Sequence, residues 1–311
     1  LKAASEITGC NIYGKAEYLN PGGSVKDRAA LALIKDAEEK KLISKGGTIV
    51  EGTAGNTGIG LCLIGNSVGY KTVIVMNDNQ TQEKKDMLKN IGADLRLVPP
   101  KPYKDDGNYV KVAGRLAEEL KNSNNHGVVW ANQFDNTANS KGHYESTGPE
   151  IWDQTDGKVT HFVVGVGTGG TISGVGKFLK EKNPNVKIWG VDAYGSVLKK
   201  YHETGVFDKA EIYPYVTEGI GEDMIPKNID FDIIDGFTKV TDKDAAVFCR
   251  ELLKQEGMFL GNSAGAAIKG VLQLKDHFNP DDLVVVLFHD HGSRYLKKIY
   301  NDDWMQEMGY M

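Results

Sequence analysis

Lys26 lies in the segment YLNPGGSVKDRAAL, residues 18–31, at a position where a helix does not favour a lysine. Ser24 and Asp27 have the spacing of a capping box, which predicts a helix that begins at Ser24. The aligned peptide dipoles make the first turn of a helix partly positive, and this disfavours a cation such as Lys26. A solvated surface lysine would tolerate the position, so the segment alone leaves a chemical role for Lys26 open.

A glycine-rich turn in IVEGTAGNTGIGL, residues 49–61, has the composition of an anion site. The pattern predicts a strand that ends near Glu51 and a helix that starts near Ile59. Backbone N–H groups at a helix start can bind an anion together with nearby hydroxyl and amide groups. The side chains that would converge there are those of Thr53, Asn56 and Thr57. An ordinary strand-to-helix connection explains the same composition equally well.

A second turn, in HFVVGVGTGGTISGVGKFL, residues 161–179, has the composition of a phosphate site. Two glycines stand between the hydroxyls of Thr168 and Thr171, directly after an apolar strand and before a helix. Small residues let the backbone approach a phosphate, and both hydroxyls can donate to it.

A third turn, in GMFLGNSAGAAIKGVL, residues 257–272, is again predicted as strand, polar turn and helix, with Ser263 as the helix cap. Taken together, the three turns offer a phosphate site, a second anion site and an unusually placed lysine. Pyridoxal phosphate requires one phosphate site and one lysine for a Schiff base, and an amino-acid substrate supplies a carboxylate. A helix N-terminus would lower the pKa of Lys26, and a neutral amine is the form that attacks an aldehyde.

A dinucleotide site is the rival interpretation. Gly165, Gly167 and Gly170 satisfy G-x-G-x-x-G, and Asp192 follows about 20 residues later at the end of the next predicted strand. This motif leaves the other two turns and Lys26 without a role.

The elements that must position these turns alternate along the chain. Apolar segments of strand length occupy residues 10–19, 46–52, 70–76, 93–99, 127–133, 161–167, 187–193 and 282–290. Amphipathic segments of helix length include 82–91, 109–122, 174–183 and 242–257. This alternation is typical of an α/β fold whose parallel sheets carry helices on both faces.

The length of 311 residues fits one large or two medium α/β domains. We expect an N-terminal subdomain over residues 1–137 and a C-terminal subdomain over 138–311, with the first strand able to cross between them. The net charge of −5 provides no basic surface for nucleic acid, and no apolar segment reaches the length of a membrane span. The chain opens on Leu1 without a signal peptide, and we expect some residues to precede it.

Three widely spaced cysteines form neither a disulfide framework nor a CxxC pair, which favours a cytoplasmic protein; they are Cys10, Cys62 and Cys249. FHDHGSRY, residues 288–295, invites a metal site at His289, Asp290 and His291. Two histidines and one aspartate make an incomplete ligand set, so we expect no metal.

The chain resembles, over essentially its whole length, the cysteine synthase and cystathionine β-synthase family of fold type II pyridoxal phosphate enzymes. NPGGSVKDR is similar to the family's Schiff-base lysine motif, GTAGNTGI to its substrate-carboxylate loop and GVGTGGTISG to its phosphate loop. The resemblance implies two α/β subdomains of the tryptophan synthase β type, each a mostly parallel twisted sheet with helices on both faces. It also implies a homodimer.

The resemblance implies a role for each candidate residue. Lys26 would carry the cofactor and then move the α-proton of the substrate. Asn56 would touch both the substrate and the pyridine 3′-oxygen, and Ser263 would bond to the pyridine nitrogen, which favours β-elimination over transamination. The phosphate would be held by Gly167, Thr168, Gly169, Gly170 and Thr171. The substrate would contact Thr53, Ala54, Gly55, Asn56, Thr57, Gln133 (in NQFDNTAN) and Gly219 (in TEGIGEDMIP).

Two departures bear on the substrate. Ala54 stands where the carboxylate loop of the family usually has serine, so one hydroxyl donor is missing. TEGIGEDMIP (217–226), GNSAGA and NDDWMQEMGY resemble cystathionine β-synthases, whereas VEGTAGNTGIGL and ANQFDNTAN resemble cysteine synthases.

The sequence therefore predicts a pyridoxal phosphate enzyme that replaces the β-substituent of a serine-type amino acid with a thiol. We favour the cystathionine β-synthase reaction, L-serine with L-homocysteine. The alternative is cysteine synthase, O-acetyl-L-serine with sulfide, with release of hydrogen sulfide from cysteine as a side activity. From other classes, a dinucleotide-dependent oxidoreductase remains open, and an inactive relative is disfavoured by the intact Lys26. Small amino acids and thiols or sulfide are the expected partners, without nucleic acid or membrane.

Overall fold

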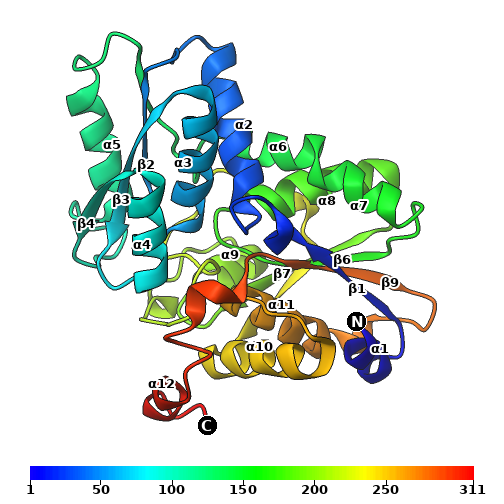
Figure 1. The fold of residues 1–311 in the computed structure, drawn as a ribbon. Helices are drawn as coiled ribbons and strands as arrows, with labels where there is room; N and C mark the ends of the chain where they lie inside the picture. The colour runs from blue at the N-terminus through cyan, green and yellow to red at the C-terminus, as the bar shows by residue number, and fades with distance from the viewer.

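The computed structural model describes all 311 residues, which form two parallel sheets with helices around them (Figure 1). The smaller sheet has the order β4-β3-β2-β5 and consists of β2 (Thr48–Gly52), β3 (Lys71–Asn77), β4 (Asp94–Val98) and β5 (Val128–Trp130). The larger sheet has the order β1-β9-β6-β7-β8 and consists of β1 (Asn11–Ala16), β6 (His161–Gly165), β7 (Lys187–Ala193), β8 (Gly236–Val240) and β9 (Leu283–Phe288).

Helices cover both faces of the four-stranded sheet, as the alternating side chains of β3 show. Val73 and Val75 pack with helix α5, whereas Ile74 and Met76 pack with helices α3 and α4. Successive side chains of a strand point to opposite faces, so an unbroken apolar strand requires helices on both. The helices of this half are α2 (Lys26–Glu39), α3 (Asn56–Val68), α4 (Gln82–Ile91) and α5 (Tyr109–Leu120).

The five-stranded sheet is covered in the same way. Val284 and Val286 of β9 belong to a core formed with helices α1, α10 and α11, whereas Val285 and Leu287 belong to a core formed with α7 and α8. The helices of this half are α1 (Lys2–Thr8), α6 (Ala138–Glu145), α7 (Thr147–Gln154), α8 (Gly170–Lys182), α9 (Leu198–Thr204), α10 (Asp242–Glu256), α11 (Asn262–Gln273) and α12 (Asp302–Glu307). No helix has the length and apolar character that a membrane crossing requires.

The predicted α/β class and the parallel sheets are confirmed, and the strand and helix segments named in the alternation along the chain are all present. The first strand, β1, pairs with β9 and so lies in the sheet formed mainly by the C-terminal part of the chain. The division near residue 137 stays a prediction. Strand β8 was not predicted, because GFTKV is short and only partly apolar.

Three predicted details are wrong. Helix α2 begins at Lys26 rather than Ser24, because the Asp27 carboxylate accepts a hydrogen bond from the backbone N–H of Gly22 (2.5 Å) and does not close a capping box. Helix α3 begins at Asn56, three residues before Ile59, since Gly55 adopts a φ of 132° that lets the chain turn at once.

The third detail is the strand predicted before Ser263. The segment from residue 257 to 260 forms no strand, and Leu260 makes only an isolated bridge to His291. The segment connects α10 to α11, and Leu260 is buried in the core that these helices share with β6, β7 and β9.

Candidate active site

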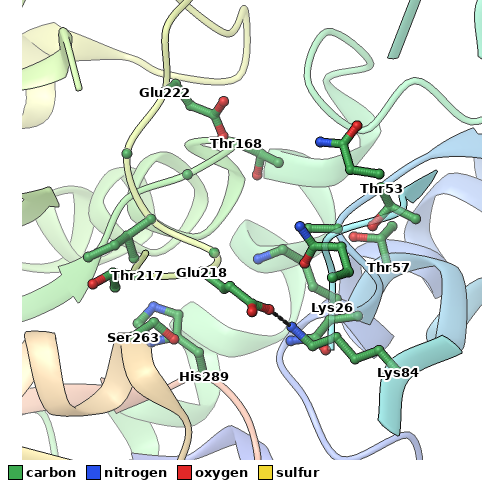
Figure 2. Close-up of a pocket in the computed structure, with 18 of the residues that line it drawn as sticks. Lys26, Thr53, Thr57, Lys84, Thr168, Thr217, Glu218, Glu222, Ser263 and His289 are labelled. Atoms are coloured by element: carbon green, nitrogen blue, oxygen red, sulfur yellow. Dashed lines mark hydrogen bonds and ion pairs between the residues drawn. The ribbon is translucent and has the colours of Figure 1, made fainter. Parts of the chain in front are cut away.

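A cavity of about 410 Å³ opens where strands of both sheets end. Thr53 follows β2, Gly167 follows β6 and His289 follows β9, and all three residues line the cavity. Ligands of open α/β sheets bind at the carboxyl ends of the strands, because the loops there can converge without breaking the sheet. Figure 2 shows side chains from both halves of the chain pointing into this space.

Lys26, the first residue of α2, lines this cavity. Desolvation by the surrounding protein lowers the pKa of Lys26 from its ordinary value, while the carboxylates of Asp290 and Glu222 act in the opposite direction. The expected shift is therefore present, but burial rather than the helix terminus is its leading cause. A lowered pKa increases the share of neutral amine, the nucleophilic form.

The carboxylate loop is held by its own hydroxyl groups. Thr53 Oγ1 accepts a hydrogen bond from the backbone N–H of Gly55 (3.0 Å), and Thr57 Oγ1 donates to Gln133 Oε1 (2.6 Å). Thr53, Ala54, Thr57 and Gln133 line the cavity, whereas Gly55 provides the turn behind them. The structure thus brings Gln133, far away in the sequence, to the loop where the resemblance placed it.

Asn56 is fixed from both ends of its amide. Its Nδ2 donates to Asp290 Oδ2 (2.8 Å), and its Oδ1 accepts from Arg294 Nη1 (2.7 Å). Asp290 Oδ2 also accepts from the hydroxyl of Tyr295 (2.7 Å). This network orients the amide at the cavity wall, and Asn56 itself lines the cavity.

The phosphate loop requires its glycines for close approach. A Cβ on Gly167 would lie 2.8 Å from the carbonyl oxygen of Gly219, and a Cβ on Gly169 would lie 2.1 Å from the Ile229 side chain. Gly170 is equally crowded, since its Cβ would meet Asn139 at 2.1 Å. The loop therefore presents backbone rather than side chains at the start of α8, as an anion site at a helix N-terminus demands.

The two threonines of this loop are placed differently. Thr168 lines the cavity, and its Oγ1 accepts from Asn139 Nδ2 (3.1 Å). Thr171 lies behind the loop with Gly169 and Gly170, outside the cavity lining, and its Oγ1 is 3.2 Å from His143 Nε2. Ser263 lines the cavity from the first turn of α11, and Gly219 lines it from the loop between α9 and β8.

The three residues considered for a metal point in different directions. His289 Nε2 lies 3.2 Å from the carbonyl oxygen of Gly165, and burial lowers the pKa of His289 to about 4. Asp290 bonds to Asn56 and Tyr295, whereas His291 bonds to Ser293. The structure contains no group of three or more His, Cys, Asp or Glu side chains placed to hold a metal ion.

Asp192, which the dinucleotide interpretation needs near the ribose, is engaged elsewhere. Its two oxygens accept from the backbone N–H groups of Ala193 (2.9 Å) and Lys199 (3.0 Å), at the start of α9. It does not line the cavity beside the glycine loop.

Several cavity residues escaped the sequence analysis, namely Lys84, Tyr109, Tyr215, Glu222 and Lys298. Lys84 belongs to an amphipathic helix whose charged residues all look solvated in the sequence. Glu222 directly follows the Gly-Ile-Gly of TEGIGEDMIP, and this neighbourhood is the one feature of the sequence that could have marked it as a cavity residue.

Comparison with known proteins identifies the family. The family model described as "Pyridoxal-phosphate dependent enzyme" matches residues 1–290. The chain belongs to this family, and its cofactor is pyridoxal phosphate.

Two curated relatives and one solved structure narrow the class. Cysteine synthase 1 of Neurospora crassa is 43% identical over 310 residues, which cover 99% of this chain and 81% of the relative. Cystathionine beta-synthase of Apis mellifera is 40% identical over 303 residues, which cover 97% of this chain and 58% of the relative. The crystal structure of a hydrogen sulfide-producing enzyme from Fusobacterium nucleatum is 37% identical, with a TM-score of 0.84 over 93% of each chain. The predicted resemblance and fold type are confirmed, and the chain is a pyridoxal phosphate enzyme of the β-replacing cysteine synthase and cystathionine β-synthase kind.

Proposed function

We propose that the chain forms L-cysteine from O-acetyl-L-serine and sulfide, as a cysteine synthase. The observation that carries the proposal is one cavity that holds Lys26 between a carboxylate-binding loop and a glycine loop at a helix N-terminus. The greater identity and the fuller coverage of the cysteine synthase relatives support this reaction better than the cystathionine β-synthase reaction favoured above.

The residues present fit the cofactor. Lys26 would attach it through its amine, the backbone from Gly167 to Thr171 would hold its phosphate, and Ser263 would face the ring nitrogen. When bound, pyridoxal phosphate supplies an electron sink for charge that develops at Cα of the amino acid. The observation behind this fit is that a Cβ at any glycine of the loop would clash with its neighbours. Only a backbone without side chains lets several N–H groups reach one phosphate.

Around this group, the chain's own residues bind the substrate and move its protons. Thr53, Asn56, Thr57 and Gln133 would orient the substrate carboxylate, and charge-assisted hydrogen bonds of this kind are roughly twice as strong as neutral ones. Lys26, once free, would take the α-proton and return it. A general base must carry no proton when it acts, and the lowered pKa of Lys26 favours that form.

Cystathionine β-synthase activity is the second candidate, and a specific observation favours it. The segment from Thr217 to Glu222, which resembles that branch, lines the cavity with six consecutive residues. A thiol substrate that approaches the β-carbon from this side would contact a segment similar in sequence to that of cystathionine β-synthases.

A product assay that crosses two donors, O-acetyl-L-serine and L-serine, with two acceptors, sulfide and L-homocysteine, tests the proposal. We expect O-acetyl-L-serine with sulfide to give the highest kcat/KM. A clear preference for L-serine with L-homocysteine would overturn it in favour of the second candidate. The homodimer and the cytoplasmic location stay predictions, and sedimentation velocity would test the first of them.

A further inference from the structure

Glu222 is a carboxylate in the cavity wall to which the proposed reaction gives no role. The backbone around it is held at three points: Gly221 N–H donates to the Val166 carbonyl (2.7 Å), Glu222 N–H donates to Ser196 Oγ (2.9 Å), and Val197 N–H donates to the Glu222 carbonyl (3.0 Å). Because the backbone is pinned, the side chain stays at the cavity. Figure 2 shows it beside Thr168 of the phosphate loop.

The carboxylate of Glu222 makes no hydrogen bond or ion pair with another residue, although the residue is half-buried and lines the cavity. Its Oε1 is 3.6 Å from the point where a Cβ on Gly167 would lie, so it borders the phosphate loop. A carboxyl group that faces a cleft without a partner in the protein is a candidate for a functional role.

Its surroundings favour the protonated form. Burial, followed by the neighbouring carboxylates of Asp223 and Asp192, raises the pKa of Glu222 to about 8, while Lys26 across the cavity acts in the opposite direction. The hydroxyl groups of Tyr109 and Tyr215 are the other titratable groups that face it, and both keep their protons, because burial and the nearby carboxylates raise their pKa values. At neutral pH, Glu222 therefore holds a proton that it can release.

We propose that Glu222 is a catalytic acid–base residue that protonates the departing β-substituent of the amino-acid donor and takes a proton back from the incoming thiol. This inference rests on the proposed β-replacement and specifies its donor class. It extends the set of usable donors from those whose β-substituent leaves as a stable anion to those, such as L-serine, whose β-substituent leaves only when it is protonated.

The two steps balance. With L-serine, Lys26 takes the α-proton, which it later returns, and the electron pair left at Cα forms a second bond to Cβ. The bond from Cβ to oxygen breaks with its electron pair on the oxygen, and the Glu222 proton converts that oxygen to water. In the second step the thiol proton moves to the Glu222 carboxylate as sulfur bonds to Cβ, so the residue ends in its starting form. Acetate leaves O-acetyl-L-serine as a stable anion and needs no proton, so of the two donors only L-serine depends on Glu222 in the first step.

The test compares the wild-type enzyme with Glu222→Gln and with Glu222→Asp, all loaded with cofactor, in a rapid-mixing measurement of the first step with each donor. Removal of a general acid typically costs about 10²- to 10⁴-fold in rate, so we expect that loss for Glu222→Gln with L-serine. The rate of this first step with O-acetyl-L-serine should fall by a much smaller factor, because acetate leaves without a proton. Glu222→Asp keeps a carboxyl group and should recover part of the serine rate.

The pH profile provides a second readout that a merely structural role would not move. Because the protonated form is required, the wild-type serine rate should fall as pH rises past about 8, and Glu222→Gln should lack this limb. An unchanged cofactor absorption band in both variants controls for folding.

Equal losses with both donors, or an unchanged serine rate in Glu222→Gln, would overturn the inference and point to Lys26 as the proton source. A wild-type enzyme that uses O-acetyl-L-serine but not L-serine would overturn it as well, while the proposed function stands. A wild-type enzyme that uses neither donor would overturn the proposed function itself.

Discussion

Nζ of Lys84 lies 2.5 Å from Oε2 of Glu218, and this ion pair joins helix α4 in one half of the molecule to the loop between α9 and β8 in the other (Figure 2). Lys298 contacts the second oxygen of Glu218 at 2.7 Å. Lys84 is 2% exposed and Glu218 is 8% exposed, so the pair is shielded from water. Burial opposes ionisation of Glu218, yet the two lysines hold its pKa below the ordinary value.

Glu218→Gln should therefore destabilise the protein. Breaking a buried pair by removing one partner typically costs about 3 to 5 kcal/mol, because the remaining charge is left without compensation. We expect a loss near the lower figure, since Lys298 is 23% exposed and partly solvated. Urea unfolding at pH 7 measures it, and adding Lys84→Met to Glu218→Gln should recover part of the loss.

The exposed pair of Lys121 with Glu118 supplies the control, because its side chains are 62% and 72% exposed. Glu118→Gln should change the unfolding free energy by less than about 1 kcal/mol. The contribution of Glu218 is present above the pKa of an unfolded glutamate and is lost as pH falls through its lowered folded pKa. A loss for Glu218→Gln no greater than that of the control would contradict the argument.

Lys26→Ala should abolish turnover and leave the fold intact. The side chain lines a cavity rather than a packed core, so its removal deletes little packing and relieves the desolvation of an amine. We expect the cofactor's lysine-linked absorption band to vanish while the thermal midpoint stays equal or rises. Far-ultraviolet circular dichroism provides the check on folding. Turnover at the wild-type rate in this variant would refute the assigned role of Lys26.

The positions of the turns after β2 and β6 were predictable because their chemistry is local. Glycines and hydroxyl residues directly after apolar strands mark loops at the carboxyl ends of a sheet, and those ends converge in a parallel fold. Strand β8 was missed since GFTKV is short and has two adjacent polar residues, Thr238 and Lys239. The strand before Ser263 was wrongly expected because a buried connection between two helices can be apolar too.

The roles of Lys84 and Glu222 could not be predicted, because they depend on contacts between distant parts of the chain. In the sequence, Lys84 is one of several charged residues on a helix that packs only one face. Nothing local shows that the opposite half of the molecule covers it and supplies Glu218. Glu222 becomes a candidate for acid–base chemistry only through its place in the cavity, where burial and then the neighbouring carboxylates raise its pKa.

His143 is a testable support of the phosphate loop. Its Nδ1 lies 2.8 Å from Thr147 Oγ1 and its Nε2 lies 3.2 Å from Thr171 Oγ1, inside the protein. If the Thr171 hydroxyl donates to the phosphate, it must accept from Nε2–H, which fixes the tautomer. His143→Leu removes this donor and should weaken cofactor binding about fivefold to thirtyfold, the equivalent of about 1 to 2 kcal/mol. Equilibrium dialysis measures the affinity, and His143→Gln, which keeps an N–H, should retain more of it.

The same residue sets an acid limit on stability. Burial lowers the pKa of His143 to about 3, so the folded protein keeps it neutral while the unfolded chain protonates it below about pH 6.5. The contribution of His143 to the free energy of unfolding is complete above that pH. It declines by about 1.4 kcal/mol per pH unit as pH falls toward 3. His143→Gln should show a shallower decline of the unfolding free energy over this range, and an identical slope in both proteins would contradict the expectation.

Ala54 is where the carboxylate loop departs from its family, and Ala54→Ser should tighten substrate binding. The residue lines the cavity next to the hydroxyls of Thr53 and Thr57. A hydrogen bond to a charged group contributes about 1.5 to 3 kcal/mol, and each 1.4 kcal/mol is a factor of about ten in affinity. We therefore expect about tenfold to a hundredfold tighter binding of L-serine. Titration of the cofactor absorption band with L-serine in both proteins measures it.

A loop already adapted to alanine would give a different result. In that case the new hydroxyl would have no partner, and an unsatisfied polar group in the cavity wall costs binding rather than adding to it. Ala54→Gly is the matched control, because it removes a methyl group without adding a donor and should not tighten binding. Equal or weaker affinity in Ala54→Ser would show that the backbone N–H groups of the loop, and not a missing hydroxyl, determine how tightly the carboxylate is held.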